Sequence, residues 1–139
     1  MLAEGAPGDG SGGLPSGRER LPRRGRIRQG DEIRHLLRHG LRRRTSSLDV
    51  FVSPRSAGNS RFGTIVPKHR RTIVERNRLR RRLREIGRRD VLPALRACGW
   101  EGDVLVRTRP QAYEVDFATL RRELLGITEA LCSESSPSA

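Results

Sequence analysis

The residues with the clearest chemical potential form a run of arginines from Val74 to Glu85, with the sequence VERNRLRRRLRE. Six of these twelve residues are arginine and only two are acidic. A guanidinium group is planar and permanently charged, and it pairs with phosphate oxygens through two parallel hydrogen bonds. This density of like charge predicts a polyanionic partner, with nucleic acid ahead of an anionic membrane surface.

The charge of the whole chain favours the same kind of partner. Its 139 residues carry 29 basic and 16 acidic side chains, a formal net charge of +13. From Lys68 to Asp90 there are eleven basic and three acidic residues, an excess that salt bridges between helical turns cannot neutralise. A charge run is commonly a solvated helix face, but this one is almost all of one sign on an already basic chain. Contact with RNA or DNA is therefore predicted.

The arginine run must lie on a helix that docks on its own domain. On a helical wheel, Leu83 and Ile86 lie within about 40° of Leu79, which predicts an apolar seam. The side away from the seam carries Asn77, Arg80, Arg81, Arg84 and Arg88, and Arg76 and Arg78 flank the seam. The helix lacks the sustained heptads of a basic zipper, which argues against a DNA-binding regulator of that kind.

The flanking segments predict a single α+β domain of sheet and helices. Helical spacing of apolar residues predicts helices, and alternation of apolar and polar residues or short apolar runs predict strands. The predicted order is a helix over 31–40, strands over 47–54 and 61–67, the arginine helix, a strand over 103–109 and a helix over 117–132. A turn signal at Ser56–Asn59 predicts that the first two strands form an antiparallel pair.

The chain ends and the cysteines suggest an intracellular protein. Residues 1–17 and 132–139 are rich in small and polar residues, so they are predicted to be disordered tails around an ordered domain, 18–131. Cys98 and Cys132 lie in no metal-binding or redox spacing, which fits reduced thiols in the cytoplasm. There is no apolar run of membrane-spanning length and no apolar signal core, so no membrane partner is predicted.

Few other residues suggest chemistry. His35 and His39 are four residues apart, as in some zinc sites, but they lack the glutamate of an HExxH motif and are predicted to be solvent-exposed. Asp31 and Glu32 are predicted to interact favourably with the positive end of the helix dipole at a helix start rather than to bind a metal. Trp100 is predicted to pack inside the domain. We find no nucleophile, no phosphate-binding glycine loop and no acid/base pair, so no catalytic residue and no metal site are predicted.

The arginine helix resembles a known signature. Arg76, Asn77 and Arg78, followed by further arginines and by Glu85, come after a strand that ends in a basic loop. This arrangement resembles the RNR motif of the bacterial ribonuclease P protein component. The family pattern extends over about residues 26 to 131 and includes a glycine in the second strand, here Gly63.

The resemblance implies both a fold and an activity. It implies one two-layer α+β domain like the second domain of ribosomal protein S5, with a mixed sheet of about four strands and a left-handed crossover through the RNR helix. It also implies the protein subunit of an endoribonuclease that removes the 5′ leader of precursor tRNA. In that enzyme the catalytic RNA, bound 1:1 by the protein, holds Mg²⁺ and hydrolyses the phosphodiester. A non-enzymatic RNA-binding protein of ribosomal type is the alternative.

The resemblance further implies two RNA-binding regions. One is the basic loop and helix, where the residues expected to contact the catalytic RNA are Lys68, His69, Arg76, Asn77, Arg78, Arg80, Arg81, Arg84 and Arg88. The other is a groove between the first helix and the sheet, which would hold the leader. Ile33 and Leu37 occupy positions where the family commonly has aromatic residues, so Phe51 is the remaining stacking candidate, with a core packing role as the alternative. Arg70, Arg71 and Glu75 also depart from the small or apolar residues usual in the family, and they are expected to alter the local path of the chain.

Overall fold

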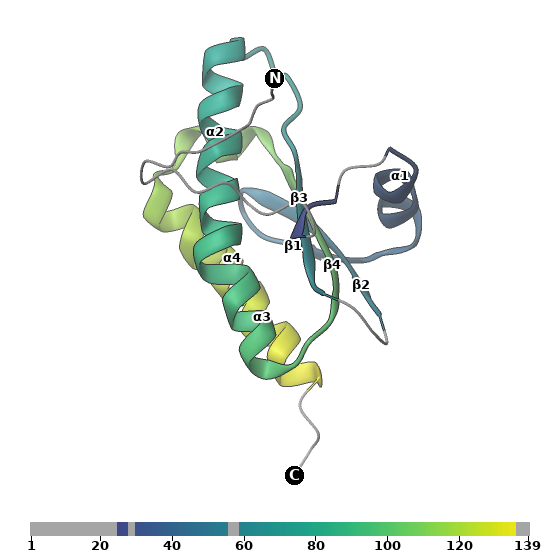
Figure 1. The fold of residues 1–139 in the computed structure, drawn as a ribbon. Coiled ribbons are helices and arrows are strands. Elements are labelled where there is room, and N and C mark those ends of the chain that lie inside the picture. The colour runs from purple at the N-terminus through teal and green to yellow at the C-terminus, as the bar shows by residue number, and fades with distance from the viewer. Residues whose placement is uncertain (1–24, 28–29, 56–58, 136–139) are drawn as a thin grey trace, which may run out of the picture.

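The computed structural model describes residues 25–27, 30–55 and 59–135. Its elements, in chain order, are α1 (Gly30–His39), β1 (Leu41–Arg44), β2 (Leu48–Pro54), β3 (Arg61–Ile65), α2 (Ile73–Ile86), the π-helical η3 (Gly87–Val91), α3 (Leu92–Cys98), β4 (Gly102–Thr108), the 3₁₀-helical η4 (Pro110–Glu114) and α4 (Phe117–Ser135). The predicted helices and strands are all present (Figure 1). The predicted tail from residue 132 begins too early because α4 continues to Ser135. The predicted tail over 1–17 lies outside the described residues.

The strands form one mixed sheet in the order β1-β2-β4-β3. β2 is antiparallel to both β1 and β4, whereas β3 is parallel to β4. The predicted antiparallel pairing of the strands over 47–54 and 61–67 is therefore wrong, because β4 lies between them. Val104, Leu105 and Val106 are buried on both faces of β4, which suits a central strand. The turn signal at 56–59 is local and could not reveal a strand that arrives forty residues later.

Strand β1 was not predicted, because its sequence, LRRR, has no apolar alternation. Its pairing with β2 places Arg42 opposite Phe51 and Arg44 opposite Asp49. The Asp49 carboxylate accepts hydrogen bonds from both arginines, 3.3 Å from Arg42 Nη2 and 2.8 Å from Arg44 Nε. Charges on an edge strand also disfavour pairing with another sheet.

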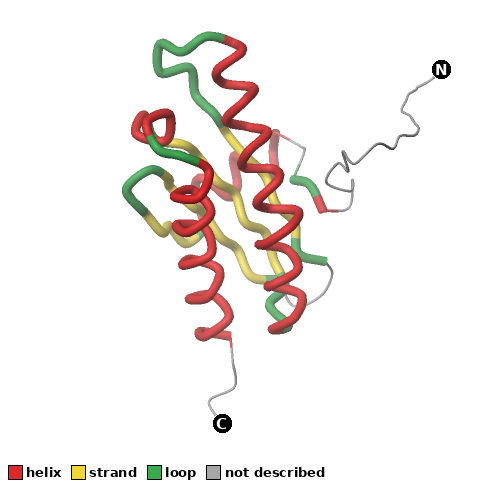
Figure 2. Tube along the Cα trace, turned by 90° about the vertical axis from the view of Figure 1, so that its left-hand side faces the viewer, coloured by secondary structure: helices red, strands yellow, loops and turns green. Residues whose placement is uncertain are grey.

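Helices cover both faces of the sheet. The continuous helix formed by α2, η3 and α3 lies beside α4 on one face, over a core that includes Val50, Phe62 and Val106 (Figure 2). α1 lies on the other face, where Leu36 packs with Phe51 in a second, smaller cluster (Figure 1). The predicted two-layer arrangement thus gains a third, partial layer. The predicted parallel crossover is present as β3–α2–η3–α3–β4, and its left-handedness stays a prediction.

α2, η3 and α3 follow one another without a break as one long helix (Figure 1). A π turn takes in one more residue than an α turn, so it shifts the phase of the following residues by about 100°. Without η3, Leu95 would lie about 160° from Leu79 on the helical wheel. The shift brings it to about 60°, and both side chains are buried in the same core. The π turn therefore keeps the apolar side of α3 aligned with that of α2.

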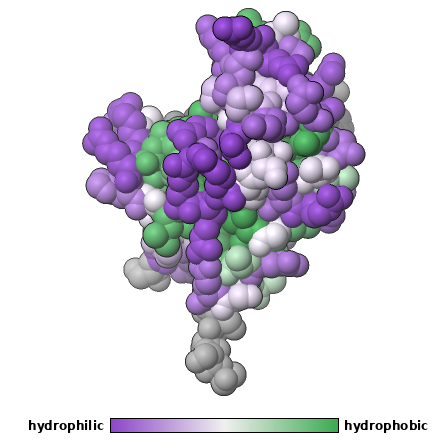
Figure 3. All heavy atoms as spheres, turned by 180° about the vertical axis from the view of Figure 1, so that it is seen from behind, coloured by the Kyte–Doolittle hydropathy of each residue, from purple (hydrophilic) through white to green (hydrophobic). Residues whose placement is uncertain are grey.

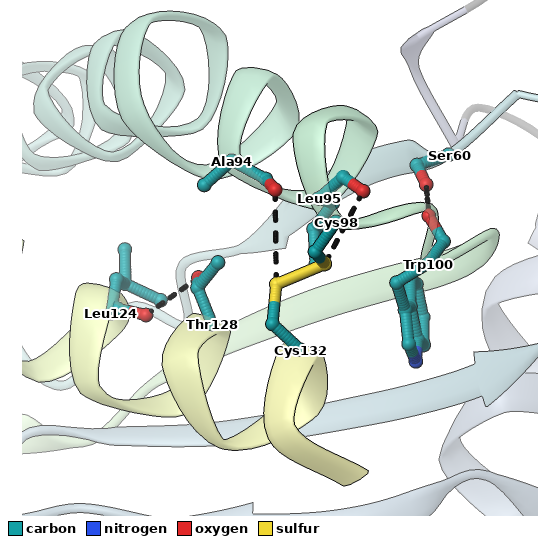
Figure 4. Close-up of a disulfide and its surroundings, with 8 residues drawn as sticks. All are labelled: Ser60, Ala94, Leu95, Cys98, Trp100, Leu124, Thr128 and Cys132. Atoms are coloured by element: carbon teal, nitrogen blue, oxygen red, sulfur yellow. Dashed lines mark hydrogen bonds between the residues drawn. A yellow bond between two sulfur atoms is a disulfide. The ribbon is translucent and has the colours of Figure 1, made fainter. Parts of the chain in front are cut away.

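Cys98 and Cys132 form a disulfide, so the prediction of reduced thiols is wrong (Figure 4). Cys98 is the last residue of α3, and Cys132 lies near the end of α4. Their Cα atoms are 5.7 Å apart, within the usual range for a disulfide. The pairing depends on the packing of α3 against α4, and the sequence pattern did not predict α3. Within the described residues, no helix has both the length and the apolar character needed to cross a membrane.

Gly87 is expected to tolerate no side chain. A Cβ atom at this position would lie 2.5 Å from Cδ2 of the buried Phe62 ring. Gly87→Ala should therefore lower the free energy of unfolding by about 1 to 3 kcal/mol, measured by urea denaturation. Gly126→Ala in α4 is the matched control, since a Cβ there meets no atom within 4 Å. It should stabilise the protein by about 0.5 to 1 kcal/mol through helix propensity. Equal effects at both positions would contradict the close contact.

The disulfide is expected to contribute strongly to stability. It closes a loop with a sequence separation of 34 residues, and restricting such a loop in the unfolded chain is worth about 3 to 4 kcal/mol. The double variant Cys98→Ser/Cys132→Ser should lose this amount in a denaturation experiment under non-reducing conditions. A dithiol reductant should lower the stability of the parent and leave the double variant unchanged. If the reductant did not change the stability of the parent protein, the presence of the disulfide would be contradicted.

Candidate RNA interface

Helix α2 begins with a capping box. The Thr72 hydroxyl accepts a hydrogen bond from the Glu75 backbone N–H at 3.1 Å, and the Thr72 backbone N–H donates to the Glu75 carboxylate at 2.9 Å. This second bond is the main cause that holds the pKa of Glu75 below its ordinary value. Glu75 thus fixes the first turn of the arginine helix.

The apolar seam of α2 is buried as predicted. Leu79, Leu83 and Ile86 pack in the main core between the helices and the sheet. Asn77, Arg81 and Arg84 are exposed on the side of the helix away from the seam, Arg78 is exposed beside the seam, and Arg80, Arg82 and Arg88 are partly exposed. Hydrophilic side chains cover much of the face seen in Figure 3, with hydrophobic patches between them. The fold therefore gathers most of the predicted RNA-contacting arginines along one side of α2.

Several of these arginines have partners within the protein. Arg76 donates to the Val66 carbonyl from Nη2 at 3.1 Å, which ties α2 to the end of β3. Arg80 donates to Oδ1 of Asn77 at 2.7 Å, and Arg88 pairs with Glu85 at 2.9 Å. By contrast, Arg78, Arg81 and Arg82 make no hydrogen bond or ion pair with any residue that the structure describes. Arg76 therefore acts first as a structural tie, and Arg78 and Arg81 point most directly to an external partner.

The basic loop before α2 has an unusual backbone. His69 and Arg70 have φ angles of 45° and 62°, in the left-handed region that non-glycine residues seldom adopt. The Arg71 N–H closes the turn by donating to the Lys68 carbonyl at 2.8 Å. Lys68 and Arg70 are exposed, whereas His69 is half-buried with its ring nearly perpendicular to that of Tyr113. Such a conformation persists where neighbouring contacts hold it.

Arg71 supplies these contacts, a role that the sequence did not indicate. Its guanidinium lies 4.7 Å from the centre of the Tyr113 ring, 2.5 Å from a Glu114 oxygen and 3.4 Å from a Glu75 oxygen. The hydrogen bond to Glu114 is the largest cause that raises the pKa of Arg71. The Tyr113 hydroxyl also donates to the Pro67 carbonyl at 3.3 Å. The loop is thereby fastened to η4, and the only local signal was the i, i+4 spacing of Arg71 and Glu75.

The residues predicted for the leader groove lie together, but they pack against one another. Ile33 and Leu37 of α1 lie against a cluster that contains Phe51, whose side chain is only 4% exposed. Phe51 therefore takes the core packing role and is not an open platform for a base. α1 is fixed over the sheet by Arg61, which pairs with Glu32 at 2.9 Å and with Asp103 at 2.8 Å.

Two arginines lie over the Phe51 ring instead. The guanidinium carbons of Arg107 and Arg42 are 5.1 Å and 6.0 Å from the ring centre. Both arginines also pair with the buried carboxylate of Asp49, at 3.5 Å and 3.3 Å, and Arg44 pairs with it as well. Three cations share one anion, so this part of the sheet face keeps a net positive charge. Sequence reasoning missed Arg42, Arg44 and Arg107 because the sheet order that joins them was not predicted.

The remaining residues considered for metal binding do not form a metal site within the described part of the chain. The rings of His35 and His39 are 4.7 Å apart on the exposed side of α1, as their spacing predicted. Among the described residues, no three histidines, cysteines or carboxylates are grouped closely enough to hold a metal ion. Trp100 is buried, as expected.

The chain resembles proteins of one family along most of its length. The family model described as Ribonuclease P matches residues 21–131. The ribonuclease P protein component of Micrococcus luteus is 42% identical over 118 residues, covering 76% of this chain and 86% of that protein. The solved RNase P protein from Thermotoga maritima has a TM-score of 0.64 at 25% identity, covering 76% of this chain and 96% of that one. The RNase P protein of Staphylococcus aureus has the same TM-score at 18% identity, over 77% and 97% of the two chains, and shows the likeness of the fold.

The capping box predicts a pH dependence of stability. Because the pKa of Glu75 is lower in the folded protein, its stabilising effect is present above its unfolded pKa and lost as the pH falls through its folded pKa. Glu75→Gln should unfold at a lower temperature than the parent near pH 7, and the difference should shrink below about pH 4. Glu129→Gln on the exposed side of α4 is the control and should match the parent throughout. A difference that stays constant with pH would contradict the role of the Glu75 charge.

Proposed function

The chain belongs to the bacterial ribonuclease P protein family, and we propose that α2 with its preceding loop binds the catalytic RNA while the α1 side of the sheet holds the 5′ leader of precursor tRNA. As a member of this family, it is the protein subunit of an endoribonuclease that matures the 5′ end of tRNA, and its partner is the RNA subunit.

One observation carries the proposed contact with the catalytic RNA. Arg78 and Arg81 project from a helix whose opposite side is anchored in the core, and neither has a partner among the described residues. Several guanidinium groups held side by side repel one another, and a phosphate backbone relieves that repulsion. Lys68 and Arg70 extend the same positive surface around the start of α2. Asn77, Arg80, Arg84 and Arg88 border this surface and would contact the RNA from its edges, while His69 and Arg76 support it from inside the domain.

The proposed leader site rests on the cationic pair above Phe51. Arg42 and Arg107 present flat guanidinium groups beside α1, and such groups both bind phosphate and stack on bases. They would take the part played by aromatic residues in relatives, since Ile33 and Leu37 are engaged in packing. A single-stranded leader is a suitable ligand because its bases are free to stack.

In this proposal the Mg²⁺ ions and the hydrolytic step belong to the RNA subunit. The two buried carboxylates of the sheet do not suit a metal site, because Asp49 is paired with three arginines and Asp103 with Arg61 and Arg55. The protein contributes binding and charge neutralisation, one copy per RNA subunit, in the cytoplasm where tRNA is processed. The Cys98–Cys132 bond would then have to persist or re-form in a reducing compartment.

A cleavage assay tests the function directly. The cognate ribonuclease P RNA is incubated with precursor tRNA at a Mg²⁺ concentration that limits the RNA alone, with and without the protein. We expect the protein to accelerate removal of the 5′ leader. No acceleration would favour an RNA-binding protein of ribosomal type. Tighter binding to duplex DNA than to structured RNA at equal salt would favour a DNA-binding regulator.

The salt dependence of binding tests the arginine surface. Each lost phosphate contact should lower the slope of log K against log [salt] by roughly 0.7 to 0.9. Arg81→Ala should show this reduction with the catalytic RNA and unfold like the parent, because Arg81 is exposed. An unchanged slope would show that Arg81 does not contact the phosphates of the catalytic RNA.

The apolar seam of α2 allows a test of folding stability that is separate from RNA binding. Leu83 is fully buried, so Leu83→Ala should lower the free energy of unfolding by about 2 to 5 kcal/mol, measured by denaturation. Where the variant is still folded, its slope of log K against log [salt] should equal that of the parent. A small loss of stability would contradict the burial of the seam.

A further inference from the structure

The start of α2 exposes two apolar side chains that the arginine surface does not explain. Ile73 is 70% exposed and Val74 is 66% exposed, more than any other large apolar residue that the structure describes. The two residues are adjacent in the first turn of α2, at the end of the helix that extends beyond the sheet (Figure 1). They therefore form a small apolar tip on a strongly charged part of the surface.

This apolar tip is held rigidly. The capping box of Thr72 and Glu75 fixes the turn that carries Ile73 and Val74. The loop before the tip is tied to η4 through Arg71 and Glu114, and the turn after it is tied to β3 through Arg76. β-branched side chains also have few rotamers in a helix. Little conformational entropy is lost when a partner covers such a tip.

The charges around the apolar tip select the kind of partner. Lys68 and Arg70 precede it, Arg78 follows it by one turn, and none of their three charged side chains has a partner in the described part of the chain. A second copy of this chain carries the same +13 charge and would be repelled. RNA offers phosphates for the cations beside sugar and base surfaces that are apolar, both in the shallow minor groove of an A-form helix and at unstacked bases.

We propose that Ile73 and Val74 make an apolar contact with a sugar or base surface of the catalytic RNA, at a position where Lys68 and Arg70 bind the flanking phosphates. The proposal rests on the proposed function and adds to it a component of binding that salt does not screen. Charged contacts hold RNA of any sequence, whereas a rigid apolar tip requires a complementary surface on a folded RNA. The apolar tip would thus help to select one place on that RNA.

The double variant Ile73→Thr/Val74→Thr tests the apolar contact. Threonine keeps the β-branched shape and adds no charge, so the fold should be unaffected. Affinity for the catalytic RNA should fall roughly three- to thirty-fold. The slope of log K against log [salt] should equal that of the parent, because no cation has been removed. Binding to heparin, a polyanion without bases, should not change.

A matched variant and a second probe complete the experiment. Leu41→Thr replaces another exposed apolar residue, 56% exposed on β1 at the opposite edge of the sheet, and should leave RNA affinity unchanged. Parent-like affinity of the double variant for the catalytic RNA would overturn the apolar contact, as would an equal loss of affinity for heparin. Either result leaves the proposed function standing if Arg81→Ala still lowers the slope. Failure of the parent to bind the catalytic RNA would instead overturn the proposed function.

Discussion

The packing of Leu79, Leu83 and Ile86 against the sheet is the constraint on which the rest of the structure depends. Burying this seam fixes the rotation of α2 about its own axis, and the rotation decides which side chains face outward. Guanidinium groups can occupy the outer side at high density only because the inner side supplies the stabilisation of the helix. Gly87 extends the same contact, since its lack of a side chain lets the helix lie directly on the Phe62 ring. In the proposed function, folding and RNA binding thus use opposite sides of one helix.

Several of the acidic residues stabilise the fold by capping a helix or by pairing with arginines. Glu75 caps α2, Glu114 fastens the basic loop through Arg71, and Asp49 and Asp103 each hold several arginines within the sheet. Each carboxylate neutralises basic groups that serve the fold and leaves others, such as Arg81, without a partner among the described residues. The arginines thus divide into those that shape the domain and those without a partner among the described residues, which the proposed function assigns to RNA. The division follows from the positions of the carboxylates.

The sequence patterns predicted most of the helices and strands but not the order of the strands in the sheet. Periodicity is a local property, so the seam of α2 and the two-sided pattern of β2 could be read directly from residues such as Leu83 and Phe51. The insertion of β4 between β2 and β3 depends on contacts between distant segments, and the cluster of Arg42, Arg107 and Asp49 depends in turn on that order. The helical wheel correctly placed Arg81 and Arg84 on the exposed side of α2, whereas the RNA contact that the RNR motif implies stays a prediction. The wheel could not show that Arg76 is used internally, because that requires the position of the Val66 carbonyl.

The π turn between α2 and α3 makes the length of this segment as important as its composition. A residue gained or lost between Ile86 and Leu92 would rotate Cys98 by about 100° relative to α2, and so away from Cys132. Substitutions at exposed positions of the segment would leave that geometry intact. The disulfide between α3 and α4 can therefore form only when this helix contains the right number of residues. An insertion or deletion in the segment would prevent the covalent bond from forming.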